Sequence, residues 1–286
     1  MINFHIPCFI SNFNVNLTLL DMLNERPEMF YDDFHIASVF GNFPNCIWNG
    51  GRNIRGRYFP KEEQQSICEQ FNSRGVPLRL VMSNLSLNEH DVYDRYANYI
   101  MSNLNNGFNQ VIVASPILEE YIRKTYPEYP IVRSILGAEN DYCDDSDKYH
   151  LSVLKRNKNI DLDFLKNIKN KDKIEILVNE TCHKDCTREY EHYRALSNKQ
   201  LYMDDDGDVC FYGDCKRNRA GNPFMINREQ IKTIYEPMGF TNFKLAGRYN
   251  SAKTILDYTM YMVKPEHQYE FMEIMIHEVI KDSHLK

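Results

Sequence analysis

Short apolar runs alternate along the chain with longer segments in which apolar residues recur at helical spacing. The run Phe34–Phe40 has the β-branched and aromatic residues typical of a strand, whereas Glu89–Asn105 places Val92, Tyr96 and Ile100 along one side of a helix. Strands are expected at Asn3–Pro7, Phe34–Phe40, Pro77–Met82, Gln110–Ala114, Pro130–Ile135, Lys148–Leu154, Lys173–Val178 and Asn242–Ala246. Helices are expected at Val15–Asn24, Lys61–Asn72, Glu89–Asn105, Ser115 to about Tyr126, Asp161–Ile168, Asn227–Met238, Ser251–Val263 and His267–Ile280.

This order of elements predicts the fold class. Strands that are separated mostly by helices imply parallel crossovers, which favours an α/β fold of the (β/α)8 TIM-like barrel type or an irregular version of it. The alternative is an open doubly wound sheet, but no GxGxxG sequence follows the first expected strand. Because barrels of ~250 residues are single domains, we expect one domain over residues 1–286, with a cysteine-bearing insertion between the seventh and eighth strands.

Charge and terminal composition narrow the class of protein. The chain has 34 basic and 40 acidic residues, well mixed, for a net charge of −6. No basic stripe favours duplex nucleic acid, so we expect a small-molecule or short single-stranded substrate. The first residues lack a secretory signal, and no window approaches the ~20 apolar residues of a membrane span. A cytoplasmic protein without a membrane span is expected.

The cysteines give the most specific pattern in the chain. Cys182 and Cys186 follow the seventh expected strand, and Cys210 and Cys215 form a second close pair, giving C-x3-C-x23-C-x4-C. In a reducing compartment, close pairs indicate metal binding rather than disulfides. The other cysteines are isolated and are expected to be plain thiols: Cys8, Cys46, Cys68 and Cys143.

The local sequence suggests how the first pair is presented. Thr181 is a residue type that caps helices, so a helix beginning there would place Cys182 and Cys186 on one face. Four thiolates suit either a tetrahedral zinc ion or a [4Fe–4S] cluster, and the spacing does not choose between them. A radical-SAM site is disfavoured because the third cysteine of its C-x3-C-x2-C trio is replaced by Glu189.

Polar residues also follow several expected strands. In a barrel they would gather at the carboxyl ends of the strands, where active sites lie, although many such groups only cap helices or satisfy backbone donors. They are Asn49, Arg52, Asn84, Ser115, Asn157, Asn159, Asn179, Glu180 and Arg248.

The cysteine region, followed by the strand sequence FKLAGR at Phe243–Arg248, resembles the U32 peptidase family, also called collagenase-like proteases. That family includes iron–sulfur hydroxylases that act on RNA bases and on ubiquinone precursors. Its late strand typically reads FKIEGR, so Ala246 stands where the family has glutamate. The resemblance implies a barrel whose [4Fe–4S] cluster is held by four cysteines, here Cys182, Cys186, Cys210 and Cys215.

These observations together predict a modifying enzyme that works at the carboxyl end of the barrel, for instance a hydroxylase. Glu180 is the candidate for proton transfer, and Arg248 is the candidate for gripping an anionic group with its guanidinium. Asn84 and Asn179 are candidates for orienting the substrate. The alternatives are a zinc-stabilised barrel that acts as a binding protein and a peptidase-like hydrolase. A metal-dependent hydrolase would need an open coordination position, against which four clustered thiolates argue.

Overall fold

A computed structural model describes residues 1–51, 55–137, 148–182, 186–202, 221–247 and 251–282. Parallel strands close into a barrel in the order β1-β2-β3-β4-β5-β6-β7-β8, which confirms the predicted (β/α)8 TIM-like fold. The strands are β1 (Ile2–Pro7), β2 (Phe34–Gly41), β3 (Leu78–Met82), β4 (Gln110–Val113), β5 (Ile131–Arg133), β6 (Leu151–Val153), β7 (Ile174–Leu177) and β8 (Asn242–Lys244).

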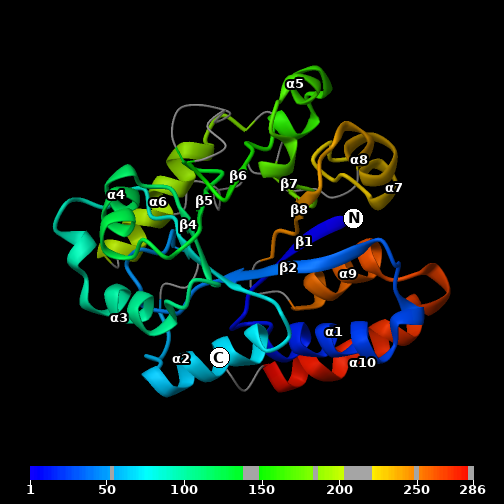
Figure 1. Ribbon diagram of the computed structural model, residues 1–286, viewed down its shortest axis with the longest axis horizontal. Helices are drawn as coiled ribbons and strands as arrows, with labels where there is room; N and C mark the ends of the chain where they lie inside the picture. The colour runs from blue at the N-terminus through cyan, green and yellow to red at the C-terminus, as the bar shows by residue number, and fades with distance from the viewer. Residues whose placement is uncertain (52–54, 138–147, 183–185, 203–220, 248–250, 283–286) are drawn as a thin grey trace.

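Helices surround the strands, as Figure 1 shows. The α-helices are α1 (Phe13–Glu25), α2 (Lys61–Asn72), α3 (Arg95–Leu104), α4 (Pro116–Thr125), α5 (Leu162–Asn167), α6 (Glu189–Tyr202), α7 (Arg228–Gln230), α8 (Glu236–Met238), α9 (Ser251–Met262) and α10 (Gln268–Asp282). A π-helical segment, η5 (Ile231–Tyr235), joins α7 to α8. Short 3-10 turns lie at η1 (Pro27–Met29), η2 (Asp91–Tyr93), η3 (Lys158–Ile160), η4 (Lys171–Lys173) and η6 (Pro265–His267). Among the described helices, none is long and apolar enough to cross a membrane.

Capping residues explain where the helices begin. The expected helix at Lys61–Asn72 is confirmed in full, but the one expected at Glu89–Asn105 begins only at Arg95. The reason is Asp94, whose Oδ1 accepts a hydrogen bond from the backbone N–H of Ala97 and so fixes the first turn. Ser115 caps α4 in the same way, through the N–H of Leu118.

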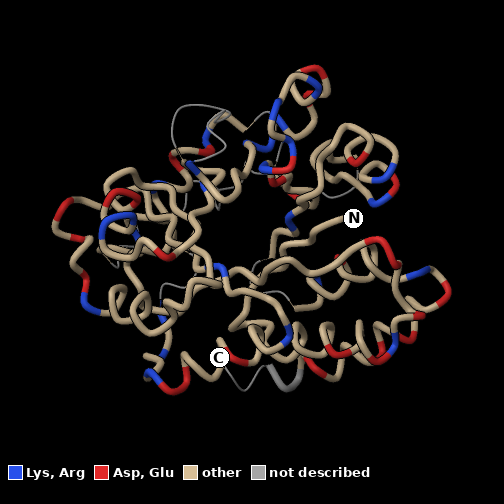
Figure 2. The backbone as a smooth tube through the Cα atoms, viewed as in Figure 1, with Lys and Arg blue, Asp and Glu red and all other residues tan. Residues whose placement is uncertain are grey.

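The apolar core has two parts. The larger part fills the layer between the strands and the helices. The smaller part lies inside the barrel and contains Phe40, Val81, Ile112, Val132, Leu151 and Val153. Because successive side chains on a strand point to opposite faces, the residues two positions away from these also project into the barrel, and several of them are polar. Figure 2 shows that basic and acidic positions are interspersed along the outer helices.

Candidate functional site

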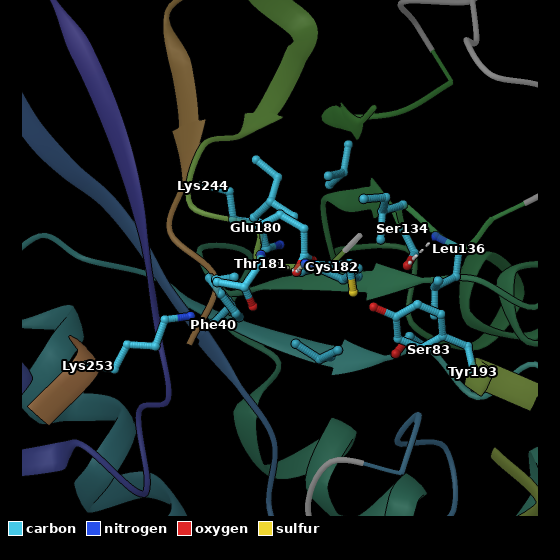
Figure 3. A pocket seen from close by; sticks show the side chains of 16 residues that line it. Phe40, Ser83, Ser134, Leu136, Glu180, Thr181, Cys182, Tyr193, Lys244 and Lys253 are labelled. Atoms are coloured by element: carbon cyan, nitrogen blue, oxygen red, sulfur yellow. Dashed lines mark hydrogen bonds between the residues drawn. The ribbon is translucent and has the colours of Figure 1, made fainter. Parts of the chain in front are cut away.

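A cavity of about 330 Å³ lies at the carboxyl end of the barrel (Figure 3). Five strands contribute its apolar surface through side chains near their carboxyl ends: Phe40, Val81, Ile112, Val153 and Leu177. Polar groups complete the wall: Ser83, Ser134, Glu180, Thr181, Cys182, Tyr193, Lys244 and Lys253. The cavity occupies the end at which barrel enzymes build their active sites.

A fully buried ionic cluster crosses the barrel interior next to this cavity. Glu175 on β7 is hydrogen-bonded to the guanidinium of Arg79 on β3, on the opposite side of the barrel, and its Oε1 lies 3.0 Å from Nζ of Lys244 on β8. Arg79 also donates from Nε to Oε1 of Gln110 at 2.8 Å. Burial alone would raise the pKa of Glu175, but Arg79 and Lys244 more than offset it and lower that pKa below its ordinary value. Glu175 is therefore an ionised carboxylate.

His5 on β1 completes the cluster as a neutral ring. Burial, with Arg79 beside it, lowers the pKa of His5 from 6.5 to about 3. Its Nδ1 lies 2.8 Å from Oγ of Ser38, and its Nε2 lies 3.3 Å from Oδ1 of Asn242 and 3.5 Å from Glu175. Since both neighbours of Nε2 are acceptors, this nitrogen carries the hydrogen, and Nδ1 accepts from the serine hydroxyl.

Lys244 connects the ionic cluster to the cavity. Its ammonium contacts Glu175 and lies 4.2 Å from the centre of the Phe40 ring, so a carboxylate and an aromatic face both hold it in place. The same side chain lines the cavity. Lys244 thus presents a positioned cation where the inward-facing apolar side chains meet the rim.

Glu180 shapes the turn that follows β7. Its Oε1 accepts hydrogen bonds from the backbone N–H groups of Thr181 at 2.7 Å and Cys182 at 3.0 Å. The helix expected to begin at Thr181 is wrong, because α6 begins only at Glu189, so Cys182 and Cys186 do not share a helix.

The two described cysteines border neighbouring cavities at this end of the barrel. Cys182 is a buried thiol in the wall of the first cavity, and Cys186 is a thiol that lines a second cavity of about 780 Å³. Arg156 lines the second cavity and pairs with Glu189 at 2.9 Å. Burial lowers the pKa of Arg156, but the nearby Glu189 and Cys182 raise it overall.

The remaining members of the predicted cysteine set, Cys210 and Cys215, lie outside the described residues, as does Arg248. Within the described ranges, no group of three or more His, Cys, Asp or Glu side chains could hold a metal ion. The four-cysteine site therefore stays a prediction. Its first cysteine lies on the cavity wall beside Glu180.

The two residues predicted to orient the substrate, Asn84 and Asn179, form hydrogen bonds within the protein. Asn84 is fully buried and donates to the carbonyls of Ile47 and Ser197, while its oxygen accepts from the N–H of Ser86. Neither it nor Asn179 is part of the cavity wall.

Asn179 joins the ends of two strands to a helix. Its Nδ2 donates to the carbonyl of Ala246 and to Oδ2 of Asp257 on α9, and its Oδ1 accepts from the N–H of Ala246. These bonds fix the turn after β7 against the segment after β8. Asn179 thereby supports the wall on which Glu180 lies.

The sequence did not lead us to predict the ionic cluster, although the pattern of residues in its strands indicates it. Arg79 and Glu175 each interrupt an otherwise apolar strand, Lys244 stands between Phe243 and Leu245, and the apolar residues on either side of each charged residue pack in the outer core. A charged residue at such an alternating position must project into the barrel interior. Lys253, on α9, has no comparable pattern around it.

No family model matches the chain, and no curated protein matches it. Among solved structures, the chain is similar to the U32 peptidase Mk0906, with a TM-score of 0.48 and 16% sequence identity over 86% of this chain and 93% of that one.

Proposed function

We propose that the chain is a U32-like enzyme that hydroxylates or otherwise modifies a small molecule or nucleobase in the cavity at the carboxyl end of the barrel. The observation that carries the proposal is the wall of this cavity, where the thiol of Cys182, the carboxylate of Glu180 and the ammonium of Lys244 border one space. A thiol, a carboxylate and a cation around an apolar pocket form a typical enzyme site, in which few polar groups orient a largely apolar ligand.

Different residues of the chain would contact the ligand, accept a proton and position the proton acceptor. The apolar side chains from five strands hold the ligand body and exclude water from it. Glu180 is the proposed proton acceptor, because it is a carboxylate in the cavity wall, and the backbone N–H groups of Thr181 and Cys182 hold it in place through Oε1. Asn179 is a positioning residue that acts through the backbone beside Glu180.

The cofactor in this proposal is a [4Fe–4S] cluster held by Cys182, Cys186, Cys210 and Cys215. Two features of the described residues fit it. Cys182 and Cys186 are thiols at the same end of the barrel, and the guanidinium of Arg156 interacts electrostatically with Cys182. When bound, such a cluster would supply one-electron chemistry beside the cavity.

The direct test is metal analysis of the full chain purified without oxygen. A cluster predicts a brown protein with about four irons and four sulfides per chain. Cys182→Ser should lose most of the iron. Cys68→Ser is the matched control, because Cys68 is also a buried thiol, with 7% exposure against 8% for Cys182, but lies on α2.

A colourless protein with about one zinc per chain would overturn the cluster and favour the zinc-stabilised binding protein. Equal iron in the two serine variants would show that Cys182 is not a ligand. Neither result would bear on the ligand of the cavity, because both concern the metal alone.

A further inference from the structure

The charged groups of the cavity have an uneven distribution. Lys253 points into the space from one side, whereas Ser83, Ser134 and Tyr193 lie on the opposite side (Figure 3). Lys244 lines the same space. The cavity therefore has cations at one end, neutral hydroxyl groups at the other, and an apolar surface between them.

The buried cluster adds no charge beyond that of Lys244 itself. Its four ionisable groups comprise two cations, Arg79 and Lys244, one carboxylate, Glu175, and the neutral His5. These groups together carry one positive charge in a region that is almost closed to water. Such a charge acts strongly on a neighbouring ligand, because the surroundings screen it weakly.

The carboxylate of Glu180, in the cavity wall, offsets the positive charge of the cluster only in part. Glu180 borders the cavity, but its Oε1 is turned to the backbone N–H groups of Thr181 and Cys182. Those two donors offset its negative charge locally.

We infer that the ligand of this cavity is a small carboxylate with an apolar ring or chain, a specificity that rests on the proposed function of the same site. Lys244 and Lys253 bind the carboxylate. Phe40, Val81 and Ile112 contact the apolar body. The charged groups around this end are three cations, Arg79, Lys244 and Lys253, and two carboxylates, Glu175 and Glu180. Their net charge of about +1 is matched better by a singly charged carboxylate than by a dianionic phosphate.

The probe is benzoate, and benzamide is its neutral counterpart of nearly the same shape. Calorimetric titration of the full chain should show benzoate binding about tenfold more tightly than benzamide, the size expected for a hydrogen bond to a charged group. Lys253→Met should remove most of this preference and leave benzamide affinity unchanged. This comparison does not depend on Lys244→Met, which would remove one of the two cations beside Glu175 and can impair folding.

The matched control is Lys158→Met. Lys158 has the same local surroundings as Lys244, a carboxylate (Asp161, 3.6 Å) and an aromatic ring (Phe164, 4.7 Å), but is not part of the cavity wall. Its variant should keep the full preference for benzoate. Equal affinities for the two probes, no binding of either, or an unchanged preference in Lys253→Met would each overturn the inference. None of these results would alter the iron content, which tests the proposed function separately.

Discussion

Replacing Glu175 by glutamine is the sharpest test of the ionic cluster. The side chain of Glu175 is completely buried, and it contacts Arg79, Lys244 and His5. Glutamine keeps the shape but removes the charge, so Arg79, also completely buried, loses its ionic partner. Breaking a buried ion pair by neutralising one member typically lowers the free energy of unfolding by about 3–5 kcal/mol. We expect Glu175→Gln to fall in that range.

The assay is urea denaturation followed by circular dichroism, with the midpoint compared at unchanged slope. The matched control is Glu63→Gln. Glu63 also pairs with an arginine, Arg57, but both side chains are partly exposed, at 33% and 45%. Surface pairs contribute about 0–1 kcal/mol, so this variant should stay close to the unmodified protein.

A double variant separates the pair from the rest of the site. Arg79→Met combined with Glu175→Gln removes both charges, and we expect it to be more stable than Glu175→Gln alone, because the completely buried cation is gone and only Lys244, whose side chain is 12% exposed, has lost its carboxylate. The reasoning would be refuted if Glu175→Gln unfolded within about 1 kcal/mol of the unmodified protein, the size of a surface pair.

Two further predictions concern stability. The pKa of His5 is about 3 in the folded protein and 6.5 in the unfolded chain. The contribution of this neutral ring to the free energy of unfolding is therefore complete above about pH 6.5, and it falls by up to about 1.4 kcal/mol per pH unit as the pH drops toward 3. His5→Gln should flatten that slope in denaturation midpoints taken between about pH 6.5 and 4.5, and an unchanged slope would contradict the buried neutral ring. Asn84→Ala should lower the free energy of unfolding by about 1–3 kcal/mol through its lost buried hydrogen bonds and leave benzoate affinity unchanged; a large change in affinity would instead restore Asn84 as a substrate-orienting residue.

Local sequence predicted the elements better than their ends. The helix at Lys61–Asn72 was predicted in full because Pro60 marks its start and its apolar residues recur at helical spacing. The sixth strand was expected at Lys148–Leu154, but only Leu151–Val153 pairs with both neighbouring strands. Strand ends depend on which neighbours are in register, and this is a property of the closed barrel rather than of one segment.

The turn after β7 shows where a helical pattern placed a helix start too early. The sequence from Thr181 onward has good helix formers, yet α6 begins only at Glu189, and the carboxylate of Glu180 accepts hydrogen bonds from the N–H groups of Thr181 and Cys182. An acidic residue just before a cap residue has several conformations open to it, and the packing of Glu180 on the cavity wall selects one. Its position at the strand end could be predicted, but its local hydrogen bonds could not.

The ionic cluster needs an explanation other than stability. Arg79 and Glu175 are 96 residues apart in sequence and meet only because the barrel closes. A buried ion pair can often be exchanged for apolar residues without loss of stability, and here Nη2 of Arg79 has no hydrogen-bond acceptor among the described residues. A network selected for stability alone would satisfy that donor. What the cluster does achieve is a fixed ammonium on Lys244 at the cavity wall. Glu175 is therefore best understood as a positioning residue for Lys244.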